Sequence, residues 1–281
     1  MAIIIRPVQG HAQYRAVEQV QRDAWSMEDI EIVPSTLLVT AHKNGGLVVG
    51  AFTDDAEPQM VGFLFGFPGL HSDGTIKHCS HQMGVLPAYR DQRLGQRMKL
   101  AQREYVQQQG IGLITWTFDP LESRNGNLNL HKLGAICNTY IIDAYGPMRR
   151  AGFAELPSDR FQVEWHINSL HVAARVATTA DALALQSLLE AGVPIINPPD
   201  TRNTFLRPTD SLQTLAGDRL LVAVPPNFQS IRNTDIGLAR AWRQHTRYLF
   251  QVAFMAGYTA IDLLSDGVQI CYLLEKDWRL V

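Results

Sequence analysis

The stretch GVLPAYRDQRLGQRMK, residues 84–99, constrains the fold more than any other part of this 281-residue chain. It ends the strand-like run IKHCSHQMGVL (76–86), passes a proline and a charged loop, and opens a helix that Gly110 can stop. The run GLITWTF (112–118) then reads as a buried strand. This region therefore predicts a strand, a loop, a helix and a second strand. The helix has apolar residues at helical spacing: Leu94, Met98, Ala101 and Tyr105.

Further strand and helix patterns flank this unit and extend it into a mixed sheet. Two glycine-bearing apolar runs separated by a polar turn predict an antiparallel hairpin. The order of elements predicts an α/β domain over residues 1–168, with a mixed and mostly antiparallel sheet. Its other elements are a strand IIIRPV near residue 3, a helix at 11–24, the hairpin strands 46–52 and 60–67, a helix at 121–134 and an alternating strand at 160–167.

The remaining residues, 169–281, predict a smaller α/β region. Its order of strand, proline, helix, glycine and strand repeats that of residues 78–118, so the tail is either a degenerate half-copy of the first unit or a coincidental match. In this second segment the charged loop is missing, and Asp235 occupies the place where an anion would bind the backbone, which argues against a second phosphate site. The predicted elements are a helix at 180–191, a proline-rich loop at 193–208, strands at 219–226, 259–264 and 268–274, and a long helix at 233–256.

Composition narrows the class of protein. Hydrophobic residues make up 46% of the chain, which is typical of a globular protein, and the net charge of −2 gives no general attraction to nucleic acid or anionic membranes. The sequence has no run of 18 apolar residues and only three cysteines, without metal-type spacing. We therefore expect a soluble, cytoplasmic protein with no membrane and no nucleic-acid partner. Exposed sheet edges make a homodimer reasonable.

The charged loop predicts binding of an anion. Backbone amides at a helix start lack intrahelical partners and create positive potential, and Gly95 allows a ligand to approach the backbone closely. Arg90, Arg93 and Arg97 surround this position and add attraction for negative charge. The alternative is an ordinary strand-to-helix junction with solvated arginines. Neither the nucleotide P-loop motif nor the dinucleotide-binding glycine motif is present.

The same loop resembles the coenzyme A pyrophosphate loop of the GNAT acyltransferase superfamily. The signature in that family is a strand ending V-x-P, then Y-R, then [QR]-x-x-G-x-[GA] opening a helix, and residues 92–96 match it position by position. Arg97 departs from it, because glycine or alanine is usual there. The resemblance extends over residues 3–168 in element order. With its long tail, the chain is also similar to a poorly characterised bacterial subfamily of predicted acetyltransferases.

The resemblance implies that acetyl-coenzyme A is the acyl donor, with no metal. In the family, the backbone of Met83 and Val85 would pair with the pantetheine arm, and the Val85 amide would stabilise the oxyanion. Amides from Gln92 to Arg97 would hold the pyrophosphate, and Arg90 or Arg93 would lie over the 3′-phosphate. The full set of implied donor-binding residues is Met83, Val85, Arg90, Gln92, Arg93, Leu94, Gly95, Gln96, Arg97, Thr117, Asn125 and Asn127.

Acyl transfer to an amine needs a base, and an acid can protonate the departing thiolate. Strand alternation predicts that Cys79, His81 and Met83 share one face, which places His81 near the donor as the candidate base. A hydrogen-bonded surface histidine is the alternative. The tyrosine that serves as acid in the family is replaced here by Leu130, so the candidates for this role are Tyr140 and Tyr145, unless both are core residues or no acid is used.

Three other clusters invite a functional interpretation. His78 and His81 suggest zinc, but strand alternation points them to opposite faces. Asp119 and Glu122 would suit a cationic amine substrate, although a turn and a helix start explain them equally. The arginines of the long helix, Arg240, Arg243 and Arg247, are expected to be solvated around an apolar face.

The sequence therefore predicts an acetyltransferase that moves an acetyl group from acetyl-coenzyme A to a small amine. The first alternative is a catalytically inactive coenzyme A-binding sensor or scaffold, which Leu130 supports. The second is a phosphate- or RNA-binding protein that uses the arginine loop, which the negative net charge argues against.

Overall fold

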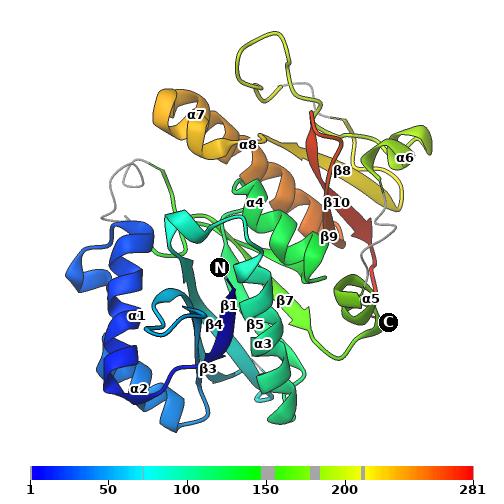
Figure 1. The fold of residues 1–281 in the computed structure, drawn as a ribbon. Coiled ribbons are helices and arrows are strands. Elements are labelled where there is room, and N and C mark those ends of the chain that lie inside the picture. Colours follow the sequence, from blue (N-terminus) through cyan, green and yellow to red (C-terminus); the bar gives the residue numbers. More distant parts are fainter. Residues whose placement is uncertain (1, 72, 147–155, 178–183, 210–212, 281) are drawn as a thin grey trace. The chain divides into compact units, whose positions relative to one another are not determined.

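The computed structural model describes residues 2–71, 73–146, 156–177, 184–209 and 213–280, and is shown in Figure 1. Its contacts divide the chain into two compact units. The first comprises Met1–Trp116 and His166–Asn168, and the second comprises Thr117–Trp165 and Ser169–Val281. The expected boundary after residue 168 is one of the points where the chain passes between units, and residues 117–165 belong with the C-terminal part. No helix among the described residues is long and apolar enough to cross a membrane.

The first unit is built on a five-stranded sheet in the order β1-β2-β3-β4-β5. The first three pairings are antiparallel, including the predicted hairpin, and β4 pairs with β5 in parallel. The last two residues of β5 already belong to the second unit. The strands are β1 (Ile3–Pro7), β2 (Leu47–Thr53), β3 (Met60–Leu70), β4 (Ile76–Val85) and β5 (Leu113–Phe118).

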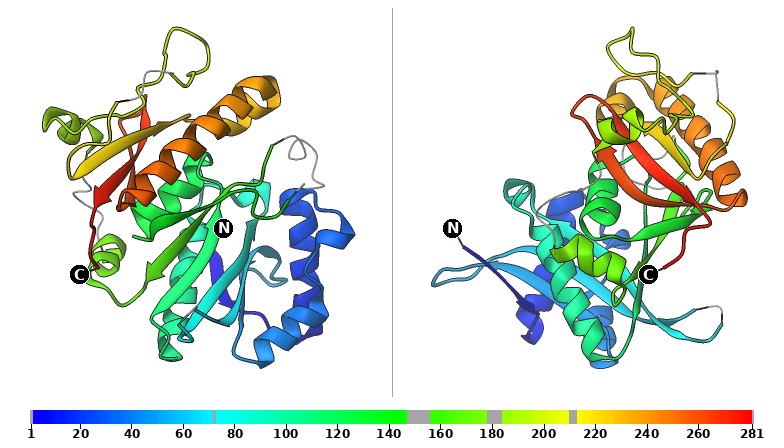
Figure 2. Two further views of the ribbon diagram at one scale, coloured as in Figure 1. Left: turned by 180° about the vertical axis from the view of Figure 1, so that it is seen from behind. Right: turned by 90° about the vertical axis from the view of Figure 1, so that its right-hand side faces the viewer.

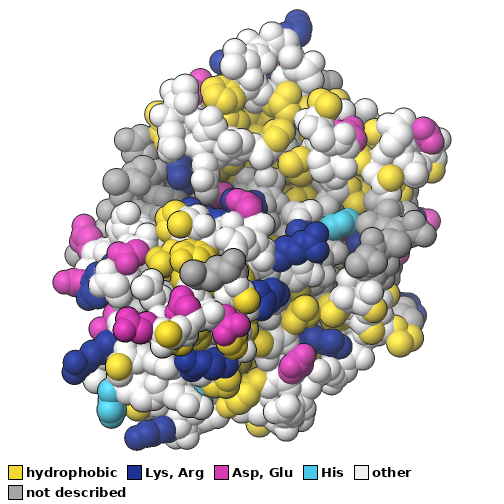
Figure 3. Space-filling model, in the orientation of Figure 1, with side chains coloured by type: hydrophobic (Ala, Val, Ile, Leu, Met, Phe, Trp, Pro, Cys, Tyr) yellow, Lys and Arg dark blue, Asp and Glu magenta, His cyan; other side chains and the backbone are white. Residues whose placement is uncertain are grey.

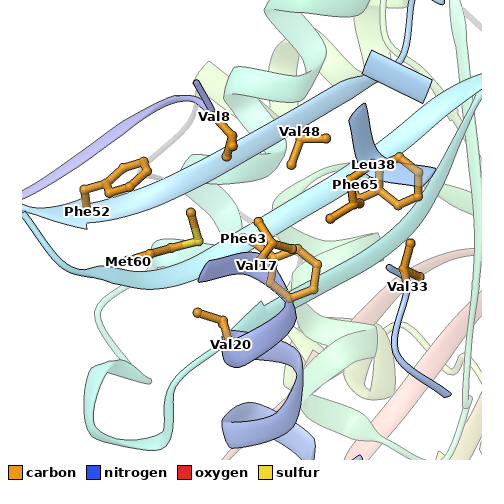
Figure 4. Close-up of a cluster of buried hydrophobic side chains, with 10 residues drawn as sticks. All are labelled: Val8, Val17, Val20, Val33, Leu38, Val48, Phe52, Met60, Phe63 and Phe65. Atoms are coloured by element: carbon orange, nitrogen blue, oxygen red, sulfur yellow. The ribbon is translucent and has the colours of Figure 1, made fainter. Parts of the chain in front are cut away.

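Helices cover both faces of this sheet, as the views in Figures 1 and 2 show. Helices α1 (Gly10–Trp25) and α2 (Ser35–Lys43) bury one face through a cluster that includes Val17, Leu38 and Phe65 (Figure 4). A short 3₁₀ turn, η1 (Asp29–Glu31), lies between these helices. Burial of such side chains is the main driving force for the layered arrangement.

Helix α3 (Leu94–Gln108) covers the opposite face and follows the 3₁₀ turn η2 (Pro87–Tyr89). Leu94 and Met98 pack there against a cluster from β1, β2 and β3. Of the four apolar residues at helical spacing, Leu94 and Met98 are buried as predicted, but Ala101 and Tyr105 are only partly buried. The observed buried face of α3 consists of Leu94, Met98, Lys99, Gln102 and Val106.

The second unit contains an antiparallel sheet in the order β7-β6-β9-β10-β8. In the tail, β10 lies between β8 and β9, whereas β4 and β5 of the first unit pair directly. The two strand–helix–strand segments therefore share their order but differ in pairing. The strands are β6 (Ile136–Ile141), β7 (Arg160–His166), β8 (Arg219–Val224), β9 (Tyr258–Ser265) and β10 (Ile270–Lys276).

The second unit also contains most of the helices. The predicted helix at 233–256 is confirmed as α8. It begins at Ile236, because the Asp235 carboxylate accepts a hydrogen bond from the Leu238 amide and caps the helix, and the short helix α7 precedes it. Part of the helix predicted at 180–191 lies outside the described residues. The helices are α4 (Ser123–Gly126), the π-helix η3 (Asn127–Lys132), α5 (Leu170–Ala177), α6 (Leu185–Glu190), α7 (Phe228–Thr234) and α8 (Ile236–Met255).

The fold class predicted from the sequence, mixed α/β with a mostly antiparallel sheet, is confirmed. The sequence analysis did not identify α2, β6, α5 or α7. All four are short, so each depends on tertiary packing more than on its own residues.

Candidate functional site

Strands β4 and β5 pair over two positions and then separate. His78 pairs with Ile114 and Cys79 pairs with Thr115, whereas β4 itself continues to Val85. The last residues of β4 therefore have β3 as their partner on one side and no pairing with β5 on the other. We call this divergence of β4 and β5 the fork.

The fork exposes two backbone amides. The Leu86 amide donates to the Val61 carbonyl oxygen of β3 at 2.9 Å, and successive amides along a strand point in opposite directions. The amides of Met83 and Val85 therefore point away from β3, toward the open side of the fork. These are the two backbone positions that the resemblance assigns to the pantetheine arm.

A β-bulge at His81 reverses the alternation of side chains along β4. Phe65 pairs with Gln82 while the next residue of β3, Gly66, pairs with Ser80, so His81 is an extra residue without a partner. The prediction that Met83 shares a face with His81 is therefore wrong. Met83 packs against the cluster on the α3 side. Sequence spacing cannot reveal a bulge, because a bulge depends on how the two strands pair.

His81 lies on the face covered by α1 and α2. Its ring contacts those of Phe65 and Phe67, with centroids 5.7 Å and 6.0 Å away, although much of the residue remains exposed. This partial burial lowers the pKa of His81 below its usual value. The imidazole is therefore neutral at pH 7 and can accept a proton. His78, by contrast, lies on the α3 face. The two histidines therefore point to opposite faces of the sheet, as predicted, and do not form a zinc pair.

The start of α3 has no side-chain cap. Arg93 precedes the helix with a φ of 57°, and no side chain accepts from the first-turn amides. The amides of Leu94, Gly95 and Gln96 thus keep their donors for a ligand, which an anion would satisfy well. The Arg97 amide differs, because it donates to the Arg93 carbonyl oxygen at 3.0 Å as the first helical bond. The group of donors predicted from Gln92 to Arg97 therefore ends at Gln96.

The three arginines of the loop have different roles. Arg90 donates to the carbonyl oxygens of Ala24 (2.8 Å) and Val85 (3.3 Å), which ties the end of α1 to the end of β4. Arg97 donates to the Ile3 carbonyl oxygen at 2.6 Å and holds β1. The Arg93 side chain is exposed, and it makes no hydrogen bond or ion pair with the described residues. Of the three, Arg93 is the cation that remains available to a ligand.

The remaining predicted site residues belong to the second unit. Thr117 and the exposed Tyr145 are 28 residues apart in the sequence, and their hydroxyl oxygens lie 2.6 Å from each other. Arg160 lies over the Tyr145 ring, 5.4 Å from its centroid. Asn125 is exposed on α4, and Asn127 is half-buried at the start of the π-helix. The structure thus brings together Thr117, a candidate for cofactor binding, and Tyr145, a candidate for the catalytic acid.

Tyr140 and Leu130 offer no accessible proton donor. Leu130 is fully buried. The Tyr140 hydroxyl donates to Asp159 at 2.7 Å, and its ring stacks on Phe250. Burial, together with the Asp159 charge, raises the pKa of Tyr140 well above its usual value. The surroundings of Tyr140 are those of a structural residue.

Ion pairs within the protein hold several of the charged residues whose role the sequence analysis leaves open. Arg243 is buried and donates to both carboxylate oxygens of Asp119, and Arg247 does the same to Asp159. The prediction that Arg243 is solvated is therefore wrong, and Asp119 is paired within the protein rather than open to a cationic substrate. Glu122 accepts from Gln229, and burial raises the pKa of its carboxyl. Among the described residues no cluster of three potential metal ligands occurs.

Comparisons with known proteins give structural neighbours only. No known family profile and no curated protein sequence matches the chain. The ribosomal-protein-S18-alanine N-acetyltransferase from Escherichia coli is 13% identical, with a TM-score of 0.46 over 59% of this chain and 94% of that chain. The yncA protein of Salmonella typhimurium, solved with its cofactor acetyl-CoA, is 15% identical, with a TM-score of 0.48 over 65% and 100%.

A third neighbour is an acetyltransferase of the GNAT family from Streptococcus pneumoniae. It is 12% identical, with a TM-score of 0.45 over 58% of this chain and 98% of that chain. At such identities and TM-scores below 0.5, the function of this chain has to be inferred from its own residues.

Proposed function

We propose that this protein is a GNAT-type acyltransferase that transfers an acetyl group from acetyl-coenzyme A to a small amine by direct attack. Acetyl-coenzyme A supplies the acyl group as an activated thioester. The observation that carries the proposal is the fork together with the uncapped start of α3. The backbone donors that the two features present lie within residues 83–96 and have no partner among the described residues.

Different residues of the first unit would bind different parts of the donor. The amides of Met83 and Val85 would hold the extended arm of the donor as a neighbouring strand does. The amides of Leu94, Gly95 and Gln96 would hold its pyrophosphate, with the exposed Arg93 adding a positive charge. Such charge-assisted bonds contribute about 1.5–3 kcal/mol each. Arg90 supports this site indirectly, by fixing the end of β4.

His81 would act as the general base. It lies on the α1 and α2 face of the fork, and its neutral imidazole can take a proton from the amine, directly or through water. The donor-binding amides belong to the first turn of α3, which covers the opposite face of the sheet. The acceptor would therefore approach from the face opposite the donor, so the two substrates would meet in the fork.

Thr117, Asn125, Asn127 and Tyr145 stay predicted site residues, and all four belong to the second unit. The Thr117–Tyr145 pair supports this assignment, because a threonine hydroxyl and a tyrosine hydroxyl in contact can share and relay a proton. Tyr140 is a weaker candidate for the catalytic acid, because its hydroxyl already donates a hydrogen bond to Asp159.

Titration calorimetry with coenzyme A tests the donor site. Arg93→Glu should weaken binding about tenfold or more, since it replaces the ligand-facing cation with an anion. Arg240→Glu makes the same change of charge at an exposed position of the second unit and should bind like the wild-type protein. Equal affinity of both variants would rule out the loop as the phosphate site.

A thiol-release assay over a panel of amines then tests turnover. Acetyl-coenzyme A consumption that depends on the added amine supports the transferase. Tight coenzyme A binding with no thiol release from any amine would favour the binding-only alternative.

A further inference from the structure

A group of polar side chains is buried between α3 and the sheet, directly beneath the fork. His78, Ser80, Lys99 and Gln102 are all at most 7% exposed, and Trp116 of β5 borders them. All of these residues belong to the first unit. The sequence gives one signal of this group, which is a lysine beside the apolar stripe of α3.

Lys99 spans the inner end of the fork. Its Nζ atom donates to the Ser80 hydroxyl at 2.8 Å and lies 3.5 Å from the centroid of the Trp116 ring. Ser80 and Trp116 are the residues that follow the last paired positions, Cys79 and Thr115. The lysine therefore contacts both strands at the point where they part.

The charge of Lys99 is not neutralised within the protein. Its partners are hydroxyl, amide and aromatic groups, with the Gln102 carbonyl oxygen at 3.3 Å, and no described carboxylate pairs with it. Both ring nitrogens of His78 and the Gln102 amide nitrogen are buried without a hydrogen-bond partner. A buried ammonium of this kind is stabilised by any anion that enters the site.

We propose that Lys99 is a catalytic acid that protonates the sulfur of coenzyme A as the thiolate departs. The inference rests on the proposed function and assigns the role left open by Leu130. As the carbon–sulfur bond breaks, its electron pair stays on sulfur, and a proton passes from the Lys99 ammonium to that sulfur. The acetyl group forms an amide with the acceptor, whose proton passes to His81, and coenzyme A leaves as the thiol. The Lys99 amine is then neutral and regains a proton from solvent after the products leave.

The length of the open strand edge places the sulfur near Lys99. Val85 lies five residues after Ser80 along the strand, a distance of about 17 Å at about 3.3 Å per residue. The pantetheine arm contains about twelve bonds of about 1.5 Å, so in its extended form it reaches a similar distance. A donor held at the start of α3 therefore brings its sulfur to the inner end of the fork.

The acidity of Lys99 suits this role. Burial lowers its pKa well below the usual value, so its ammonium gives up a proton more readily than that of an exposed lysine. His78 is the titratable group that faces Lys99 from β4, and burial with the Lys99 charge lowers its pKa to about 4, so it stays neutral. Ser80, Gln102 and Trp116, the other groups around the amine, do not titrate.

The test measures the thiol pKa of bound coenzyme A from the ultraviolet absorbance of its thiolate. In the wild-type protein we expect this pKa to lie about one unit or more below that of free coenzyme A, because Lys99 stabilises the thiolate. Lys99→Met should abolish the shift while coenzyme A still binds. Lys132→Met, at an exposed position in η3, is the matched control and should keep it.

The same shift in Lys99→Met as in the wild-type protein would overturn the assignment of Lys99 alone. Absence of coenzyme A binding to the wild-type protein would overturn the proposed function as well. If Lys99→Met does not fold, a binding measurement on the wild-type protein alone tests the role of Lys99. The wild-type protein should bind coenzyme A several-fold more tightly than desulfo-coenzyme A at pH 8, and equal affinities would contradict the proposal.

Discussion

Arg243 lies in the middle of α8, where its spacing suggests a solvated face. Its guanidinium instead forms a two-point pair with Asp119, which lies 124 residues earlier in the chain. Burial opposes the ionisation of Asp119, but the charge and hydrogen bonds of Arg243 outweigh it, so the pKa of this carboxyl is lowered. Helical periodicity cannot reveal such a partner, because the partner belongs to a distant element.

Loss of this pair should strongly destabilise the protein. Arg243→Met leaves Asp119 buried without its main counter-charge, so we expect a loss of about 3–5 kcal/mol in the free energy of unfolding. Urea denaturation measures this loss. The double variant Asp119→Leu/Arg243→Met should recover part of it, and an additive double loss would contradict the argument. In the wild-type protein, the contribution of Asp119 exists above its unfolded pKa and falls as the pH drops through the lowered folded pKa.

His81 predicts the acid limb of the pH–rate profile. Its pKa lies below the usual 6.5, so the base is neutral at pH 7, and the rate should fall only as the pH drops through that lowered pKa. His81→Ala should reduce kcat about 10²–10⁴-fold and remove this limb. His11→Ala, an exposed histidine on α1, is the control and should change neither. An unchanged limb in His81→Ala would exclude His81 as the base.

At the scale of elements, the bulge and the fork of β4 decide the character of the site. The bulge places His81 on the α1 and α2 face and Met83 on the α3 face, and the fork opens the backbone between them. The loop after β4 then leads into a helix whose first amides are uncapped. The sequence identifies each of these segments, but strand pairing decides which atoms are accessible.

Amide hydrogen exchange tests the direction of the β4 amides. In the ligand-free protein the amides of Met83 and Val85 should exchange much faster than that of Leu86, which donates to Val61. Saturating coenzyme A should slow exchange at the first two positions and leave the third unchanged. Strong protection of Met83 and Val85 in the absence of ligand would show that the fork is closed in solution.

At the scale of the whole chain, residues 117–165 belong to the same compact unit as the tail. Within this unit β6 pairs with β9, and the carboxylates of Asp119 and Asp159 pair with arginines of α8. The division at residue 168, the cytoplasmic location and the homodimer stay predictions. Figure 3 shows Lys and Arg side chains lying among Asp and Glu side chains on the visible face.

A fragment of residues 1–168 should not fold on its own. It would lack β9 and the arginines of α8, which leaves the edge of β6 and the carboxylates of Asp119 and Asp159 without their partners. Calorimetry should show a cooperative transition for the full chain and none for the fragment. A fragment that unfolds as sharply and at the same temperature as the full chain would show that residues 1–168 are an independent domain.

The sequence by itself determined most strands and helices, the mixed α/β class and the loop with Gly95, because these depend on local periodicity, turn residues and glycine. Tertiary structure alone decided that Arg90 and Arg97 brace the fold while Arg93 stays exposed. It also decided that Met83 turns away from His81 and that Lys99 bridges the fork. Those outcomes depend on strand register and on partners far away in the chain, and local sequence carries no record of either.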